Sequence, residues 1–299
     1  MAAHIPVLKD EVIEGLALTP DAKVIDCTLG GGGHAHAILA LLGPDATYLG
    51  MDADTEAIRQ AESLKTSDAT VRLVTGNFSE IRSVAEAEGI TAADAILADL
   101  GWRSDQFTDS GKGFSFTADE PLLMTYGDHE QYLFTAHDIV NDWEEESIAD
   151  VIYGYGEERF ARRIARAIVT ARETAPIATA KQLAEIVKVA VPAPFRNRRI
   201  DPATKTFQAL RIAVNDEFKV LRTLLEDAPQ LLAPAGRMAV ISFHSLEDRI
   251  VKHTFRDLAA TDSFRLITKR PITATDEELS ENPRSRSAKL RIIERITPS

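Results

Sequence analysis

Short apolar runs alternate with helix-like segments over the first hundred residues of the chain. The apolar runs fall near 24–25, 48–51, 71–74 and 95–97, and the segments between them have the composition of helices. Regular alternation of strand and helix predicts a parallel β-sheet that is covered by helices on both faces. We therefore expect an α/β fold.

The next clear core strand lies at 238–243, directly after the turn Pro234-Ala235-Gly236. Many more residues separate it from the run at 95–97 than a crossover helix requires, so an inserted domain is the simplest explanation. After this strand, the pattern predicts a helix from Leu246, a strand at 264–267, a loop near Asn282-Pro283 and a final strand at 290–296.

Two amphipathic segments stand out within the expected insertion. Residues 157–172 place apolar side chains on one helical stripe and arginines on its flank. Residues 181–191 predict a second helix, and 192–202, which hold three prolines and three arginines, predict a loop. An arginine flank is more typical of a solvated helix face than of an RNA contact, and both interpretations stay open.

A glycine-rich loop follows the first apolar run. The run ends at Asp26, and four glycines, Gly30-Gly31-Gly32-Gly33, lead into a helix-like segment. Glycines let the backbone approach a ligand, and the free N–H groups at a helix start favour ligand oxygens. The second run ends at Asp52, whose carboxylate can accept hydrogen bonds from ribose hydroxyls. Alone, this pattern also fits a nicotinamide cofactor or a simple chain reversal.

A second acid changes this picture. The fourth run ends in Asp99-Leu100-Gly101, which places Asp99 at the edge of the sheet where open α/β folds bind their ligands. A glycine loop, a ribose-type acid and an acid after the fourth strand together suit S-adenosylmethionine.

Composition and charge narrow the class of protein. The 299 residues carry a formal net charge of −12, which argues against a protein that coats nucleic acid through overall basicity. Basic residues nevertheless gather locally, so a phosphate-binding face remains compatible with the sequence. Cys27 is the single cysteine, and the histidines form no recognisable metal motif. We expect no metal site, no membrane span and a cytoplasmic location.

Several motifs in unchanged order carry a resemblance to a known family. They are His4 to Leu8, Asp26 to His34, Asp99-Leu100-Gly101, Gly113 to Phe116, Tyr155 to Phe160, Ala203 to Asn215, Ser242 to Lys252 and Asn282 to Arg291. The chain resembles the ribosomal RNA small subunit methyltransferase H family, also called MraW, almost from end to end.

The resemblance implies a fold and a reaction. The fold is that of a class I S-adenosylmethionine-dependent methyltransferase, which is Rossmann-like with a mostly parallel seven-stranded sheet and an inserted helical domain. We expect the methyltransferase domain at 1–107 and 210–299, and the inserted, substrate-recognising domain at 108–209. The reaction is methylation of the exocyclic N4 of a cytidine in the decoding centre of bacterial 16S rRNA, with 16S rRNA or the small ribosomal subunit as partner.

The resemblance also implies site residues. The expected cofactor contacts are Gly32, Gly33, His34, Asp52, Phe78, Asp99 and Gln106. Because the cytosine amino nitrogen is a poor nucleophile, an acceptor that orients its N–H groups would help, and Asp99 is the candidate. The expected substrate contacts are Phe243 and His244 at the base and Arg159, Arg163, Arg199, Arg284 and Arg286 at phosphates. For Phe114 and Phe116, core packing and substrate contact are equally good interpretations.

Two segments depart from the family pattern. Arg103 stands where the family has a serine and Thr108 where it has an acid, and the segment 121–127 lacks two Asp and one Arg. A buried Asp–Arg pair is usually lost together, because either charge left unpaired is costly, so this pattern indicates coordinated replacement. Two alternatives therefore stay open: a methyltransferase with a changed acceptor, and a ribosome- or RNA-binding factor that keeps the fold without turnover.

Overall fold

The computed structural model describes residues 5–66, 68–100, 111–196 and 200–297. The chain forms two compact units, the first made of Met1–Gly101 with Phe218–Ser299 and the second of Trp102–Glu217. The expected boundary at 107/108 lies outside the described residues. The expected boundary at 209/210 falls inside a continuous helix, Thr204–Asn215, and the structure places the transition after Glu217 instead.

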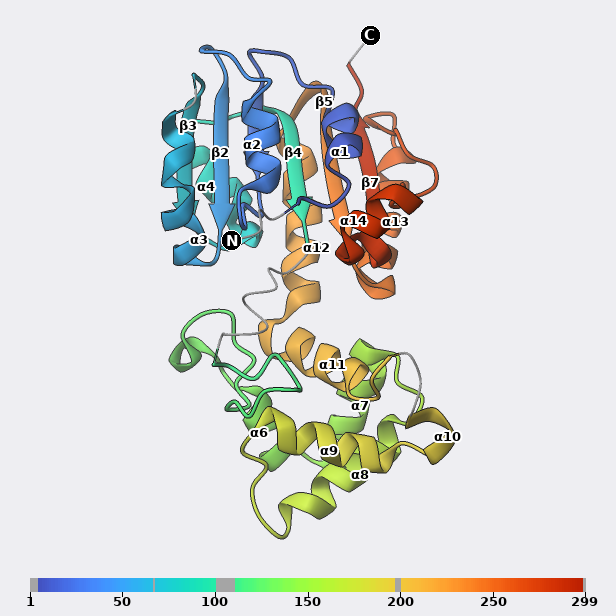
Figure 1. Cartoon of the computed structure of the whole chain (residues 1–299). Helices are drawn as coiled ribbons and strands as arrows, with labels where there is room; N and C mark the ends of the chain where they lie inside the picture. Colours follow the sequence, from blue (N-terminus) through green and yellow to red (C-terminus); the bar gives the residue numbers. More distant parts are fainter. Residues whose placement is uncertain (1–4, 67, 101–110, 197–199, 298–299) are drawn as a thin grey trace. The chain divides into compact units, whose positions relative to one another are not determined.

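The first unit is built on a seven-stranded sheet in the order β3-β2-β1-β4-β5-β7-β6 (Figure 1). Its strands are β1 (Lys23–Asp26), β2 (Thr47–Asp52), β3 (Thr70–Thr75), β4 (Ala93–Asp99), β5 (Leu232–Ser242), β6 (Phe264–Leu266) and β7 (Lys289–Arg295). Neighbouring strands from β3 to β5 pair in parallel, whereas β7 runs antiparallel to both β5 and β6. The mostly parallel seven-stranded α/β fold is therefore confirmed.

Helices cover both faces of this sheet. They are α1 (Lys9–Leu16), α2 (Gly33–Leu39), α3 (Thr55–Gln60), α4 (Ile81–Ala87), α12 (Glu217–Asp227), α13 (Ser245–Ala259) and α14 (Asp276–Glu281), with short turns η1 (Ala61–Thr66), η2 (Phe78–Glu80), η4 (Ala228–Leu231) and η5 (Pro283–Ser287). Side-chain alternation divides the strands between two cores. Val24 packs with residues of α1 and α2, whereas its neighbour Ile25 packs with residues of α4, α12 and α13.

The second unit is helical in its described part. It contains η3 (His129–Gln131), α6 (Ala136–Asp142), α7 (Glu145–Gly156), α8 (Ala161–Arg172), α9 (Ala180–Ala190), α10 (Ala193–Arg196) and α11 (Thr204–Asn215) around one apolar core. The helix expected over 157–172 begins only at Ala161, because Glu157 has φ 49° and ends α7. Residues 192–202, expected as a loop, include the short helix α10.

The helices carry no membrane-spanning signal. Among the described residues, none of them combines the length and the apolar composition that crossing a bilayer requires.

Candidate active site at the carboxyl edge of the sheet

The carboxyl ends of β1, β2, β4 and β5 lie at one edge of the sheet, because these strands run parallel. The arrowheads of β2 and β4 point to this edge in Figure 1. The residues that end these strands are Asp26, Asp52, Asp99 and Ser242. We call this the carboxyl edge, and the residues below are placed relative to it.

The glycine loop leaves β1 and is tied to the neighbouring strands by its backbone. The Cys27 N–H donates to the carbonyl of Leu97 on β4 at 2.8 Å, and the Leu29 N–H donates to the carbonyl of Met51 on β2 at 2.9 Å. Gly32 has φ 75°, a conformation that L side chains rarely adopt. A Cβ on Gly33 would lie 3.1 Å from the Pro6 side chain, so this position has little room for a larger residue.

Asp52 closes the loop from β2. One carboxylate oxygen accepts from the Gly30 N–H at 2.7 Å, and the other accepts from the Asp54 N–H at 2.9 Å. A carboxylate offers about four lone-pair sites, so it can bind several donors at once. The predicted ribose acid thus also has a structural function, which is to hold the loop against the end of β2.

Asp26 lies beneath the loop and is almost fully buried. Its carboxylate accepts from the Tyr48 hydroxyl at 2.7 Å and from the Thr28 N–H at 3.1 Å. Burial raises the pKa of Asp26 to about 6, against the lowering effect of these two hydrogen bonds. Asp26 therefore titrates close to neutral pH.

Asp99 ends β4 and faces the same loop. Its backbone N–H donates to the Thr28 hydroxyl at 2.7 Å, which fixes the end of β4 against the loop. Its carboxylate lies 3.6 Å from Nε2 of His34, and the Asp99 side chain keeps 20% of its exposure. The structure thus brings together Gly32, Gly33, His34, Asp52 and Asp99.

Phe78 follows the end of β3. It opens η2, where the Asn77 side chain caps the turn by accepting from the Ser79 N–H at 3.0 Å. Its ring is partly buried against the core that contains Met51 and Ile81. This placement leaves part of the ring accessible.

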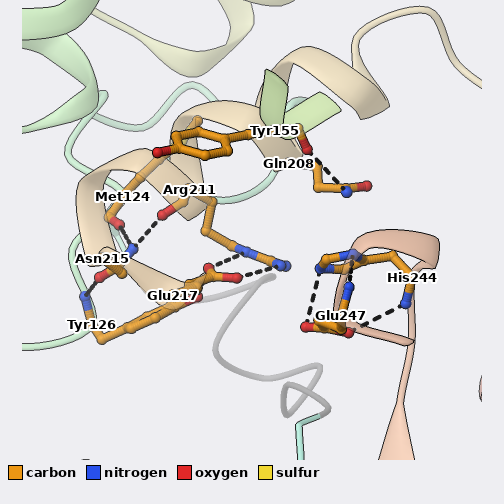
Figure 2. A network of polar contacts seen from close by, with 9 residues as sticks. All are labelled: Met124, Tyr126, Tyr155, Gln208, Arg211, Asn215, Glu217, His244 and Glu247. Atoms are coloured by element: carbon orange, nitrogen blue, oxygen red, sulfur yellow. Dashed lines mark hydrogen bonds and ion pairs between the residues drawn. The ribbon is translucent and has the colours of Figure 1, made fainter. Parts of the chain in front are cut away.

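Phe243 and His244 follow β5, and their backbone groups are bonded locally. Both backbone N–H groups donate to the Glu247 carboxylate, at 2.9 Å from Phe243 and 3.3 Å from His244, and Figure 2 shows the contacts of His244. The His244 Nδ1 accepts from the Glu247 N–H at 3.3 Å, which makes His244 the N-cap of α13. Nε2 therefore carries the ring proton, and it lies 3.0 Å from the Glu247 carboxylate. His244 has a structural function here, whatever else it contacts.

The C-terminal arginines also belong to the carboxyl edge. Ser242 at the end of β5 pairs with Lys289 at the start of antiparallel β7, so η5, which directly precedes β7, lies by the same edge. Arg284 and Arg286 on η5 are exposed. These two exposed cations thus lie on the side of the unit where the loop and the acids gather.

The remaining predicted contacts lie in the second unit or outside the described residues. The Arg159 guanidinium lies over the rings of Phe195 and Phe160, at 3.9 and 4.5 Å from the ring centroids. Arg163 is exposed on α8. Gln106, Arg199 and the departures at Arg103 and Thr108 lie outside the described residues.

The altered segment at 121–127 is held by a polar network within the second unit (Figure 2). The Tyr126 hydroxyl donates to Glu217, which also accepts two bonds from Arg211 at 2.8 and 3.1 Å. The Asn215 side chain accepts from the Tyr126 N–H and donates to the Met124 carbonyl. Tyr126 and Glu217 thus give the altered segment a polar anchor.

Phe114 and Phe116 pack inside the second unit. The Phe114 ring stacks on Tyr126 at 5.6 Å, and the Phe116 ring contacts Phe207 edge-on at the same centroid distance. Of the two interpretations left open by the sequence, core packing is the one that these contacts support.

Comparison with known proteins identifies the family. The model of the MraW methylase family matches residues 1–296. The chain belongs to the MraW methylase family. Three proteins named ribosomal RNA small subunit methyltransferase H are similar to it: those of Symbiobacterium thermophilum (47% identity over 98% of this chain and 96% of the relative), Deinococcus deserti (48%, 98% and 93%) and Koribacter versatilis (46%, 98% and 94%).

As a MraW methylase, the protein is a methyltransferase, and S-adenosylmethionine is its methyl donor. The nicotinamide alternative left open by the glycine loop is thereby excluded.

Sequence reasoning missed three groups in this MraW methylase. It did not assign Asp26, although an acid at the end of β1 directly before a glycine loop was a usable signal. Tyr48, the partner of Asp26, carries no such signal, because the contact depends on the register of β1 against β2. Glu217 and Tyr126 are 91 residues apart, so their bond could not be read from local spacing.

Proposed function

We propose that this protein methylates the exocyclic N4 of a cytidine in the decoding centre of bacterial 16S rRNA. Family membership supports the methyl transfer, and the names of the relatives support small-subunit rRNA as substrate. The observation that carries the proposal is the position of Asp99, which is a partly exposed carboxylate fixed by its own backbone beside the glycine loop. A protein with this substrate acts in the cytoplasm.

The residues at the carboxyl edge fit the chemistry of the methyl donor. S-adenosylmethionine supplies a methyl group on a positively charged sulfur. The loop around Gly32 and Gly33 offers backbone without a side chain of its own, and the Asp52 carboxylate is the group that we assign to the ribose hydroxyls. Phe78 offers a partly exposed ring for the adenine, and we include His34, Asp99 and Gln106 among the contacts.

Asp99 is the group that we assign to the reaction. The lone pair of the cytosine amino nitrogen is delocalised into the ring, so this nitrogen must be turned out of the ring plane. The Asp99 carboxylate can accept an N–H bond from the amine and hold the nitrogen within about 3 to 3.5 Å of the methyl carbon, and such positioning is the largest available contribution to the rate. The same carboxylate can accept the proton that the amine releases.

The target base has to leave its stack, and the protein has to hold its backbone. Phe243 and His244, at the end of β5, are our candidates for contact with the base. Arg284 and Arg286 are our candidates for phosphate contacts at the carboxyl edge. We assign RNA recognition also to the helical unit, through Arg159, Arg163 and Arg199.

Transfer of labelled methyl groups tests this proposal. Small ribosomal subunits that lack cytidine N4 methylation are incubated with the protein and labelled S-adenosylmethionine, and the rRNA is digested to nucleosides. Naked 16S rRNA is run in parallel, and Asp99→Asn serves as the matched variant.

The proposal predicts label in N4-methylcytidine, with transfer reduced by about 100-fold or more in the variant. Label in another nucleoside would show a changed acceptor. No transfer despite measurable cofactor binding would show a binding factor without turnover.

A further inference from the structure

His34 is a buried imidazole without a hydrogen-bond partner. It is the second residue of α2 and is 7% exposed. Neither Nδ1 nor Nε2 makes a hydrogen bond to any residue in the described part of the chain. Buried polar groups are nearly always bonded, so an unpaired one at the candidate site needs a functional explanation.

The imidazole lies beside the Asp99 carboxylate and interacts electrostatically with Asp26. Its Nε2 lies 3.6 Å from an Asp99 oxygen, just beyond hydrogen-bond distance. Asp26 lies close enough for its pKa to be lowered by His34 and raised by Asp99. The titratable groups that face this cluster are thus Asp26 on β1, Tyr48 on β2, Asp99 on β4 and His34 itself.

This arrangement bears on the orientation of Asp99. An N–H donor fixes the orientation of the carboxylate to which it donates. Neither ring nitrogen of His34 has a hydrogen-bond partner in the described part of the chain, so His34 can supply such a donor.

We propose that His34 is a positioning residue for the methyl transfer and that it acts by donating a hydrogen bond from Nε2 to the Asp99 carboxylate when the substrate amine binds. The inference rests on the proposed function, because it assigns a partner to the carboxylate that serves the amine. A movement of a few tenths of an ångström brings the 3.6 Å separation into hydrogen-bond range.

The proton balance of the step explains why the bond matters. The amine nitrogen forms its new bond to the methyl carbon while the electron pair of the carbon–sulfur bond returns to sulfur. The methylated nitrogen then carries one proton too many and releases it to the Asp99 carboxylate. His34 keeps that carboxylate aimed at the amine until the proton arrives.

Two variants of His34 test the inference. His34→Leu removes the donor, whereas His34→Gln keeps an N–H donor on a side chain of similar reach. His253→Leu, on the exposed face of α13, is the matched control. Single-turnover methyl transfer, the Kd for S-adenosylmethionine and the pH profile of the rate are measured for each protein, and thermal denaturation verifies that each is folded.

We expect His34→Leu to lower the single-turnover rate by roughly 10- to 100-fold, which corresponds to the loss of one hydrogen bond to a charged group. This loss of rate should exceed any change in cofactor Kd, His34→Gln should recover most of the rate, and the control should match the wild type.

Two outcomes would overturn the inference alone: an unchanged rate in His34→Leu, or a rise in cofactor Kd that accounts for the whole loss. A wild-type protein that makes no N4-methylcytidine would instead refute the proposed function. In that case, the two His34 variants are compared with the wild type in transfer to whichever nucleoside carries the label, and equal rates would refute the His34–Asp99 bond.

Discussion

Buried or partly buried acids occur around the glycine loop and around β7 in the sheet unit, and the donors that bind them differ. Around the glycine loop, Asp26 and Asp52 accept hydrogen bonds from backbone N–H groups and a tyrosine hydroxyl. Around β7, Asp248 binds the side chains of Arg291 and Lys289, at 2.7 and 3.1 Å. Neutral donors thus hold the first group of acids, and cations hold the second.

This difference in partners changes the pKa of one acid in each region in opposite directions. Burial raises the pKa of Asp26, and its neutral donors do not overcome this effect. Burial also acts to raise the pKa of Asp248, but the bonds and charges of Arg291 and Lys289 outweigh it and lower the pKa. Acids with perturbed pKa values gather at functional sites, so the loop region is the stronger candidate for a ligand site.

The largest expected effect comes from removing Asp248, the acid that binds Arg291 and Lys289 near β7. Asp248→Ala leaves the guanidinium of Arg291, which is 7% exposed, without the carboxylate that it binds. Removing one partner of a buried ion pair costs about 3 to 5 kcal/mol of unfolding free energy. Urea unfolding measures the loss, and Asp257→Ala, which removes an exposed acid paired with Arg256, is the control. A loss no larger than that of the control would contradict the prediction.

In the loop region, removing the acid's charge is expected to stabilise the protein rather than destabilise it. The pKa of Asp26 is about 6 in the folded protein and near 3.8 in the unfolded chain, so the folded state holds this proton more tightly. Asp26 therefore stabilises the fold fully below the unfolded pKa, and this contribution is lost as the pH rises through about 6. The total loss is about 3 kcal/mol.

Asp26→Asn removes this titration. An asparagine amide can accept from the Thr28 N–H and donate to the Tyr48 oxygen, so the two contacts survive. We expect the variant and the wild type to have similar stability near pH 4, and the variant to be more stable by up to about 3 kcal/mol at pH 8. Denaturation midpoints at both pH values measure this difference, and an equal offset at both would disprove the assignment.

Local pattern was enough to predict the sheet, because buried parallel strands appear as short apolar runs. It also placed Asp52 and Asp99 correctly at strand ends, since the end of an apolar run marks the carboxyl edge. The start of α8 was mispredicted for a long-range reason. Gly156 packs against α11, where a Cβ would lie 2.5 Å from the Lys205 carbonyl oxygen, and the chain turns at Glu157 after this contact. No pattern around residue 157 records that neighbour.

The capping function of His244 could have been predicted. The sequence His244-Ser245-Leu246-Glu247 has the spacing of a capping box, with histidine in place of the usual serine or threonine. The pairing of Asp248 with Arg291 could not, because it joins residues 43 positions apart through the packing of α13 on β7. Signals within one helical turn survive in the sequence, whereas contacts set by tertiary packing do not.

The smallest predicted effect concerns exposed cations that do not bind Asp248. Arg284 and Arg286 are exposed on η5, at the carboxyl edge, whereas Lys23 and Arg265 lie on strands near the opposite edge, and both of these are exposed too. If rRNA binds across the carboxyl edge, only Arg284 and Arg286 neutralise phosphates and so release counterions from the RNA. The double variant Arg284→Ala/Arg286→Ala should then reduce the slope of log affinity against log salt by about 1.4.

The variant Lys23→Ala/Arg265→Ala, with the same net charge, should leave the slope unchanged. Equal slopes for the two variants would show that overall charge, rather than this edge, governs RNA binding.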